Sequence, residues 1–283
     1  MRPKAAWCDF RSGLLKFRTG VIELKRITIF AKGNLDVRDT LHSCVLGGKL
    51  VWNGINEVFR ESGSEIYARV IHETWTRSDA LLESTGEVPS AITERILPLG
   101  PYSSESQFSR RVIGVKADII VLSIQPDIIM KLVRHRKQGF LFHPYDWHGW
   151  APEVQHWLRH EFYPVGLLEL EEFMSNFKAL ISEIRNKSSA EILIFNVSSV
   201  IPGDQTHNYQ SLPEALATRI RRFNLGLVEV SECTGVSIID VDHILAREGT
   251  NATKFSTLHF SAAGCKAIAV EFARVMRERL CLN

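Results

Sequence analysis

The stretch Arg26–Asp39, RITIFAKGNLDVRD, decides the fold, because an apolar run of β-branched and aromatic residues ends there in a glycine turn. Ile27, Ile29 and Phe30 are typical of a buried strand, and Gly33 permits a tight turn. Ligands of open parallel α/β sheets bind outside the carboxyl ends of strands, beside the point where the strand order reverses. The stretch therefore predicts a first strand that leads into an active-site turn.

Further apolar runs along the chain predict a parallel sheet interleaved with amphipathic helices. Residues 117–124 are almost continuously β-branched and apolar, as expected for a central strand that is covered on both faces. Helical spacing near residues 49–61 predicts a helix on one face of the sheet. The predicted strands lie near residues 26–32, 65–72, 117–124, 190–197 and 236–241. Together they predict an α/β fold, a three-layer α/β/α sandwich around a five-stranded parallel sheet.

The chain of 283 residues, 45% of them hydrophobic, is long enough for one large domain. We predict an N-terminal extension over residues 1–25 and a single α/β domain over residues 26–283. Residues 86–112 carry several Pro, Gly and Ser and are interpreted as an irregular connection. Residues 136–164 are dense in aromatic side chains and histidine, which fits either a surface insertion over its own apolar cluster or a lid over a binding pocket.

The composition favours some classes of partner and disfavours others. A formal net charge of +2 without a long basic tract argues against nucleic acid, and no window approaches a membrane span. The five cysteines are odd in number and form no CxxC pair, which favours reduced thiols in a cytoplasmic protein, and no signal-peptide core is apparent. We expect a small-molecule substrate, no cofactor and no bound metal, and leave a homo-oligomer open.

Three C-terminal segments, SVIPGDQTHNY, GVSIIDVDHI and STLHFSAAGCKAIA, resemble the SGNH or GDSL hydrolase superfamily. The resemblance extends over roughly residues 26–280 by the order of elements, and LHFSAAG is its distinctive part. It implies a flavodoxin-like sandwich with strand order 2-1-3-4-5 and an enzyme that deacylates esters or acylated sugars. It also implies that His259 occupies the place of the catalytic histidine, which takes the proton of a serine nucleophile.

The other positions of the family pattern are substituted. Leu35, in the GNL turn, stands where the family has its serine, and Ser256 stands where it has the aspartate that orients the histidine. Arg77 falls near the glycine of the oxyanion hole, and Asp127 takes the place of the asparagine. An ionised carboxylate cannot donate a hydrogen bond to an oxyanion. These substitutions predict that the ordinary serine mechanism is absent.

Polar residues near the predicted strand ends supply the candidates for a rebuilt site. We predict His259 as acid or base, within reach of Asp36 or Asp127. Asp36 is a substitute nucleophile or base if the turn shifts by one residue, or else a carboxylate that merely complements the dipole of the next helix. Asp242 is a candidate for orienting His259. The predicted substrate-binding residues are Lys32, Asn34, Arg38 and Arg77, with Arg77 holding an anionic group.

The sequence leaves several functions open. We predict an SGNH-hydrolase-like enzyme with an atypical active site that acts on a small polar or acylated substrate, either an ester or an anion. The alternatives are a non-catalytic protein that binds a ligand or partner in the same pocket, and a metal-dependent enzyme. A further interpretation is that these polar residues only cap helices and form no functional site. The histidines relevant to a metal are His42, His72, His143, His148 and His207, with His156 and His160 spaced by one helical turn.

Overall fold

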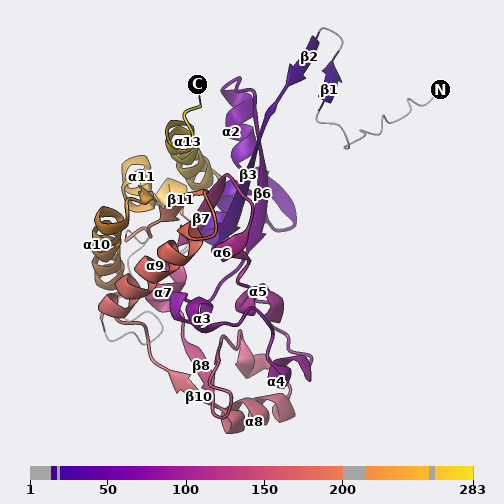
Figure 1. Cartoon of the computed structure of the whole chain (residues 1–283), viewed down its shortest axis with the longest axis vertical. Coiled ribbons are helices and arrows are strands. Elements are labelled where there is room, and N and C mark those ends of the chain that lie inside the picture. Colours follow the sequence, from indigo (N-terminus) through magenta and orange to yellow (C-terminus); the bar gives the residue numbers. More distant parts are fainter. Residues whose placement is uncertain (1–13, 18–19, 200–213, 255–258, 283) are drawn as a thin grey trace, which may run out of the picture.

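The computed structural model describes residues 14–17, 20–199, 214–254 and 259–282. A central sheet runs through the upper part of the molecule, in the order β12-β11-β7-β3-β6 with every neighbouring pair parallel (Figure 1). Its strands are β3 (Lys25–Lys32), β6 (Ile66–Glu73), β7 (Ile119–Ser123), β11 (Glu191–Phe195) and β12 (Ser237–Ile239). Numbered along the chain, this order is 2-1-3-4-5. The predicted fold class and strand positions are confirmed.

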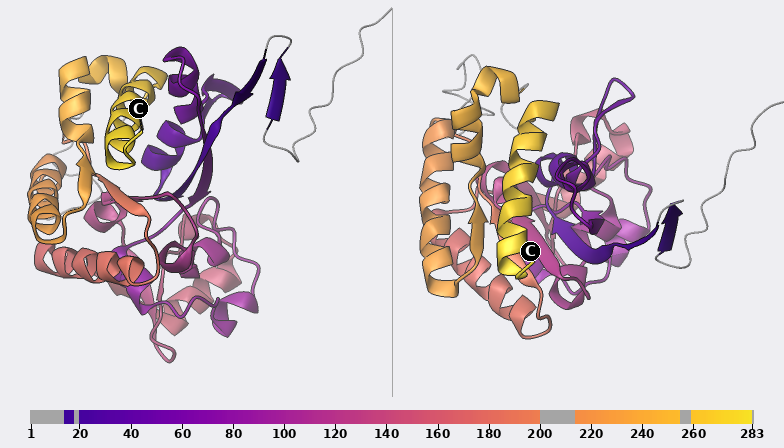
Figure 2. Two further views of the ribbon diagram at one scale, coloured as in Figure 1. Left: turned by 45° about the horizontal axis from the view of Figure 1, so that its top comes forward. Right: turned by 90° about the horizontal axis from the view of Figure 1, so that it is seen from above.

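Helices cover both faces of this sheet. One face carries α1 (Leu35–Leu41), α2 (Ile55–Glu61), α11 (Val241–Glu248) and α13 (Ala262–Arg279). The other carries α3 (Ser78–Glu83), α6 (Arg111–Gly114), α7 (Gln125–Ile129), α9 (Leu170–Arg185) and α10 (Leu216–Thr234). Figure 2 shows these layers from two further directions.

The strands read as continuous apolar runs because their successive side chains enter two different cores. In β3, Ile29 packs with the first helical layer and Phe30 with the second, and both are fully buried. In β11, Leu193 and Ile194 divide in the same way. Burying a side chain of this size stabilises the fold by about 1.5–3 kcal/mol, so both layers contribute.

A smaller antiparallel unit lies at the lower end of the view in Figure 1, beyond the carboxyl ends of the central strands. It comprises β8 (Leu132–His135), β9 (Leu141–Phe142), η1 (Trp147–Gly149), α8 (Pro152–Glu161) and β10 (Phe162–Val165). Its apolar cluster consists of Phe142, Trp150, Trp157, Leu158 and Phe162 from the unit itself, together with Ile92, Leu99 and Phe108 from the preceding connection. The connection that we expected to be irregular therefore contains short helices, α4 (Ser90–Thr93) and α5 (Ser104–Phe108), which pack on the insertion.

The predicted helix near residues 49–61 starts later than expected. Residues before it form a hairpin of β4 (Cys44–Leu46) and β5 (Lys49–Trp52), because Gly47 and Gly48 both adopt positive φ angles, 54° and 76°, in its turn. Gly54, with φ of 75°, then precedes α2.

The described part of the N-terminal extension is a second hairpin, β1 (Leu14–Phe17) and β2 (Gly20–Glu23), which projects away from the body of the molecule (Figure 2). A short helix, α12 (Thr250–Thr253), precedes the last part of the chain. Among the described residues, no helix is both long enough and apolar enough to cross a lipid bilayer.

Gly33 is needed in the turn after β3 for space, since its φ is not positive. A Cβ atom there would lie 2.6 Å from Val37 Cγ2 and 3.3 Å from Ser123 Cβ. We expect Gly33→Ala to lower the free energy of unfolding by about 1–3 kcal/mol in urea titrations, because Val37 is fully buried and cannot move freely. Gly114→Ala is the control, since nothing lies within 4 Å of a Cβ added there. Equal stability of the two variants would contradict this packing.

Candidate functional site

Lys32 ends β3, which lies between β6 and β7 in the sheet, and its side chain is fully buried. Its Nζ lies 3.2 Å from Glu73 Oε2 and donates to the carbonyl oxygens of Ser106 and Ser109 at 3.1 and 3.2 Å. Burial lowers the pKa of Lys32, and the adjacent Glu73 carboxylate opposes that shift. The ammonium group thus joins β3 and β6 to the segment around α5, and it does not face solvent as a substrate-binding group would.

Asp36 lies in the first turn of α1, only 3% exposed. Its carboxylate accepts hydrogen bonds from the Asn34 amide at 3.2 Å and from Ser123 Oγ, and burial raises the pKa of Asp36. These contacts tie the turn to β7. They support the structural role that the sequence left open, rather than the role of a nucleophile or base.

Asn34 and Leu35, which precede Asp36 in the chain, belong to the same turn. The Oδ1 atom of Asn34 is buried and has no hydrogen-bond partner among the described residues, so Asn34 is the one predicted substrate-binding side chain with a spare buried acceptor. Leu35, in the place of the family's serine, is partly exposed. The position of the nucleophile therefore reaches the surface, but it carries no hydroxyl.

Aromatic side chains of the connection and the insertion cover the centre of the strand ends. The ring of Tyr102 lies 4.9 Å from that of His143 and 5.4 Å from that of Tyr145. Burial raises the pKa of Tyr102, and the nearby Asp36 carboxylate adds to this shift. Tyr102, His143 and Tyr145 thus form one aromatic group that joins the connection to the insertion.

Arg77 has a structural role in place of the expected anion-binding role. Its Nε and Nη2 donate to both carboxylate oxygens of Asp79, and Nη1 donates to the carbonyl oxygens of Gly166 at 2.7 Å and Met130 at 3.4 Å. The side chain is 2% exposed. The guanidinium therefore anchors the start of α3 to the insertion. Its bidentate ion pair is with the carboxylate of Asp79.

Asp127 is fully buried beside this pair, without contact with His259 in any described interaction. Its Oδ1 accepts hydrogen bonds from the backbone amide of Ser78 at 3.0 Å and from Ser78 Oγ, which in turn accepts a hydrogen bond from Asn176 Nδ2 at 3.2 Å. Its Oδ2 is buried without a partner. Burial raises the pKa of Asp127 to about 7, so the carboxyl group is half protonated near neutral pH.

His259 lies on the exposed side of the strand ends, just before α13. Burial raises the pKa of Asp39, in α1, while Arg38 and, to a smaller extent, the charge of His259 favour its ionised form. Arg38 donates to Asp39 Oδ1 through Nε at 2.9 Å and Nη2 at 2.7 Å, with its own side chain 39% exposed. Arg38 and His259 are thus accessible ionisable side chains at this edge, while Asp39 is buried.

Asp242, the candidate for orienting His259, has hydrogen bonds with another residue. Asp242 accepts hydrogen bonds from the Ser199 amide at 2.7 Å and from Ser199 Oγ at 3.1 Å, so its carboxylate is directed to that residue. Ser256, at the position of the family's aspartate, lies outside the described residues. Asp39 was expected near the strand ends but was not paired with His259, because its place near the start of a helix is explained by the helix dipole.

The histidines that raised the question of a metal have other contacts. His72 Nε2 lies 2.9 Å from the Gly33 carbonyl oxygen, and His143 Nδ1 lies 3.1 Å from that of Lys131. Burial lowers the pKa of each to about 4, so both are neutral at pH 7. Within the described ranges, no three His, Cys, Asp or Glu side chains are arranged to hold a metal ion. His207 lies outside those ranges.

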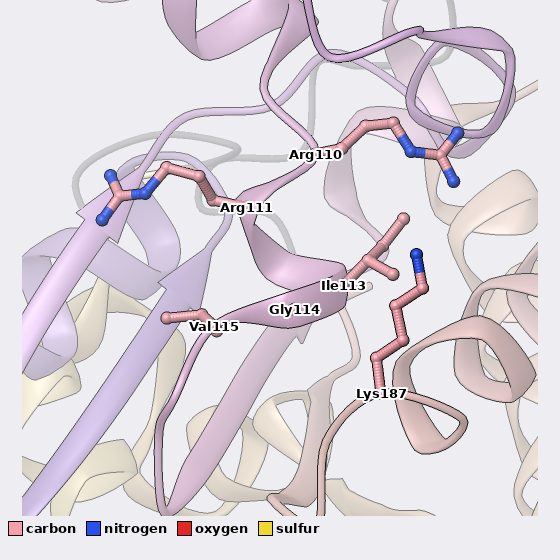
Figure 3. Close-up of a pocket in the computed structure, with 6 residues that line it drawn as sticks. All are labelled: Arg110, Arg111, Ile113, Gly114, Val115 and Lys187. Atoms are coloured by element: carbon pink, nitrogen blue, oxygen red, sulfur yellow. The ribbon is translucent and has the colours of Figure 1, made fainter.

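Two open cavities lie beside α6, at a distance in the chain from His259. One, of about 430 Å³, is shown in Figure 3, where Arg110 and Lys187 flank Ile113 and Arg111 points to the other side of the helix. The second, of about 620 Å³, shares Arg110 and Arg111 and reaches Glu73. Both arginines already have acidic partners, Glu183 and Glu73. These cavities include none of the predicted site residues.

Comparisons with known proteins give matches only at the level of structure. No protein-family model matches the chain, and no curated protein matches it. Three similar solved structures illustrate the result. LAE5, an alpha/beta hydrolase enzyme from the metagenome of Lake Arreo in Spain, is 13% identical, with a TM-score of 0.47 over 93% of this chain and 100% of that chain. The likeness is one of fold.

The other two structures carry the names expected from the sequence. A member of the lipolytic G-D-S-L family from Veillonella parvula is 11% identical, with a TM-score of 0.44 over 88% of this chain and 97% of that one. A variant of Axe2, an acetyl xylan esterase from Geobacillus stearothermophilus, is 13% identical, with a TM-score of 0.48 over 89% and 94% of the two chains. The predicted resemblance to SGNH or GDSL hydrolases is thus found among solved structures, while the fold itself rests on the sheet order described above.

Removal of the Arg77 guanidinium should destabilise the protein. Arg77→Met would leave the Asp79 carboxylate, itself 8% exposed, without its cation, and we expect the free energy of unfolding to fall by about 3–5 kcal/mol. Arg159→Met, at an exposed position of α8, should change it by less than about 0.5 kcal/mol. Urea denaturation of both variants measures the difference. A stable Arg77→Met protein with weakened anion binding would restore the ligand-binding role.

The buried Asp127 carboxyl group should make stability fall as the pH rises. Its pKa of about 7 in the folded state lies above the ordinary value of 3.8, so the folded protein binds more protons than the unfolded protein between these pH values. The free energy of unfolding therefore falls with rising pH until the carboxyl group is ionised in both the folded and the unfolded state. In the parent protein, this effect should lower the free energy of unfolding by up to about 4 kcal/mol between pH 4 and pH 8, and Asp127→Asn should abolish that decrease. Glu153→Gln, on the surface of α8, is the control. An unchanged pH dependence in Asp127→Asn would show that the carboxyl group is not strained by burial.

Proposed function

We propose that this protein is a hydrolase with an atypical site, in which His259 and Asp39 transfer protons during cleavage of a small acylated substrate. The observation that supports the proposal is that the exposed His259 favours the ionised form of the buried Asp39 carboxylate. A carboxylate beside an imidazole stabilises its protonated form, which is what an acid and base catalyst needs. The hydrolase-like fold supports the same reaction class, but not the serine mechanism.

The proposed step uses water as the nucleophile. His259 would accept a proton from a water molecule while the water oxygen forms a bond to the acyl carbon of the ester. The bond to the alcohol oxygen would then break, and the protonated imidazole would return its proton to that oxygen. The products are a carboxylic acid and an alcohol, so atoms and charges balance. Asp39 would stabilise the intermediate imidazolium ion.

Arg38 is the residue that we propose for substrate binding. Its guanidinium uses Nε and Nη2 for Asp39 and is 39% exposed, so it can also present a donor to a carbonyl or an anionic group. Asn34, with its spare Oδ1, lies in the turn before the same helix. We therefore propose that the substrate is polar and binds to side chains at the start of α1.

A specific observation favours a second candidate function, that of a non-catalytic protein that binds a polar ligand or partner. Arg77 and Asp127, at the positions of the family's oxyanion hole, are buried and engaged with Asp79 and Ser78. A site without oxyanion donors loses a large part of its rate enhancement. In this case the protein would bind acylated compounds without turnover.

The test is hydrolysis of a panel of p-nitrophenyl esters and acetylated sugars. We expect His259→Ala and Asp39→Asn to lose about 10²–10⁴-fold in kcat/KM, because proton transfer to and from the reacting atoms is removed. His156→Ala, an exposed histidine on α8, should retain the activity of the unaltered protein.

Labelling by a serine-directed phosphonate completes the test. The unaltered protein should remain unlabelled, since Leu35 has no hydroxyl, and Leu35→Ser provides the comparison at the same position. Labelling of the unaltered protein would refute the water mechanism. Saturable binding of the esters with no hydrolysis would favour the second function instead.

A further inference from the structure

The hairpin of β4 and β5 carries a cluster of exposed aliphatic side chains. Val45, Leu46, Leu50 and Val51 are 51%, 41%, 57% and 41% exposed. In the described part of the chain, the other exposed large apolar side chains are scattered over several elements, whereas these four lie within one short hairpin. Single exposed apolar residues are normal on a protein surface, but a cluster of them indicates contact with another molecule or with a lipid surface.

The exposed side chains lie on both faces of the hairpin. Val45 and Leu50 are directly paired and share one face, while Leu46 and Lys49 form the next pair toward the turn and share the other. All four of these side chains are exposed, so neither face is covered. A partner with a flat surface would cover only one face, whereas a medium that surrounds the end of the hairpin would cover both. The two apolar faces therefore favour insertion into a lipid surface.

The base of the hairpin is fixed to the body of the protein. Cys44 and Trp52 are buried and paired with each other, and Trp52 Nε1 donates to the Thr40 carbonyl oxygen at 3.0 Å. Space is also tight at Gly54, where a Cβ atom would lie 2.3 Å from the His42 carbonyl oxygen. Contacts of this kind hold the hairpin as a rigid projection.

The length of the hairpin suits the interface of a bilayer. Beyond its base, each strand has about three residues before the turn, which corresponds to about 10 Å of extended chain. Apolar faces of peripheral proteins enter the boundary between lipid headgroups and acyl chains to a depth of about 5–10 Å. The hairpin is a separate two-stranded sheet, so its outer backbone groups have no strand partners and need water or headgroups. Insertion would therefore end at the interface.

The charge of the hairpin suits an anionic lipid surface. Lys49 directly follows the turn of Gly47 and Gly48 and is exposed, and residues 43–56 contain no acidic side chain. A lysine has an apolar stem and a charged end, so it can cover apolar side chains while its ammonium group contacts lipid phosphate. A basic group near an anionic membrane surface strengthens binding, and an acidic group there would oppose it.

We propose that the hairpin of β4 and β5 is a membrane-docking element that inserts its turn and both apolar faces into the interface of an anionic lipid bilayer. Binding of this kind is peripheral and needs no helix that spans the bilayer. The inference goes beyond the proposed hydrolysis and does not depend on it, because binding is measured without turnover.

Co-sedimentation of the full-length protein with vesicles tests the proposal. We expect binding to vesicles of equimolar phosphatidylcholine and phosphatidylglycerol, with weaker binding to phosphatidylcholine alone and at high salt. Leu50→Ser and Leu46→Ser each remove an apolar side chain from a different face, and each should weaken binding about tenfold, because less apolar surface leaves water. Leu225→Ser, at a position of α10 that is 67% exposed, is the matched control and should bind as the parent does.

Lys49→Gln tests the electrostatic contribution. Its affinity for the anionic vesicles should fall about fivefold, while its affinity for phosphatidylcholine alone should not change. Lys187→Gln, at an exposed lysine after α9, is the matched control. An affinity of Lys49→Gln equal to that of the parent on the anionic vesicles would refute the choice of an anionic surface.

Other results would overturn insertion itself. The parent protein would then fail to bind either kind of vesicle, or Leu50→Ser would weaken binding while Leu46→Ser did not, which is the pattern of docking by one face. Light scattering after size-exclusion chromatography identifies the competing occupant, a second copy of this chain. A dimer that Leu50→Ser dissociates, in a protein that binds no vesicles, would show that self-association covers the hairpin. None of these results bears on His259, so the proposed function would stand or fall separately.

Discussion

The pairing of β3 between β6 and β7 is the constraint on which the rest of the structure depends. β3 pairs with β6 along its whole length and with β7 over residues 29–32, so its carboxyl end emerges between two other strands. Lys32 and the following turn must therefore enter a region that is enclosed on both sides by the sheet and from beyond by the insertion. Polar groups placed there lose their hydration and are retained only where other groups replace it.

That constraint explains why most of the polar residues near the strand ends are structural. The Lys32 ammonium is neutralised by Glu73, and the Arg77 guanidinium by Asp79. Removing one member of such a buried pair costs about 3–5 kcal/mol, because an uncompensated charge remains. Many ionisable side chains near the strand ends therefore have two explanations. They can form a ligand site, or they can form buried ion pairs and hydrogen bonds that hold helices and strands together.

The accessible chemistry lies at one edge of this region, where α1 and the start of α13 come together. Leu35 is partly exposed where a serine would act, and the exposed His259 favours the ionised form of the buried Asp39 carboxylate. The acid and base pair that we propose would therefore lie near a position, Leu35, that carries no hydroxyl. This division between enclosed and accessible polar groups is what gives His259 its distinct place.

The sequence by itself determined the fold, because apolar runs of strand length and helices with one apolar face can be satisfied by few arrangements other than a covered parallel sheet. It located all five central strands, and the segment LHFSAAG placed His259 ahead of the last helix. It did not locate the hairpin at residues 44–52, because Leu50 and Val51 also fit the spacing of the helix that follows. Local patterns do not distinguish these two uses of an apolar side chain.

Only the tertiary structure decided which charged groups meet. Arg77 and Asp127 were expected to face a ligand, but the packing of α3 against the insertion encloses them with Asp79 and Ser78. His259 favours the ionised form of Asp39, with which the sequence did not pair it. The two members of such an ion pair come from elements far apart in the chain. The free energy of the pair depends on burial and on the distance between the charges, and neither can be calculated from residue spacing along the sequence.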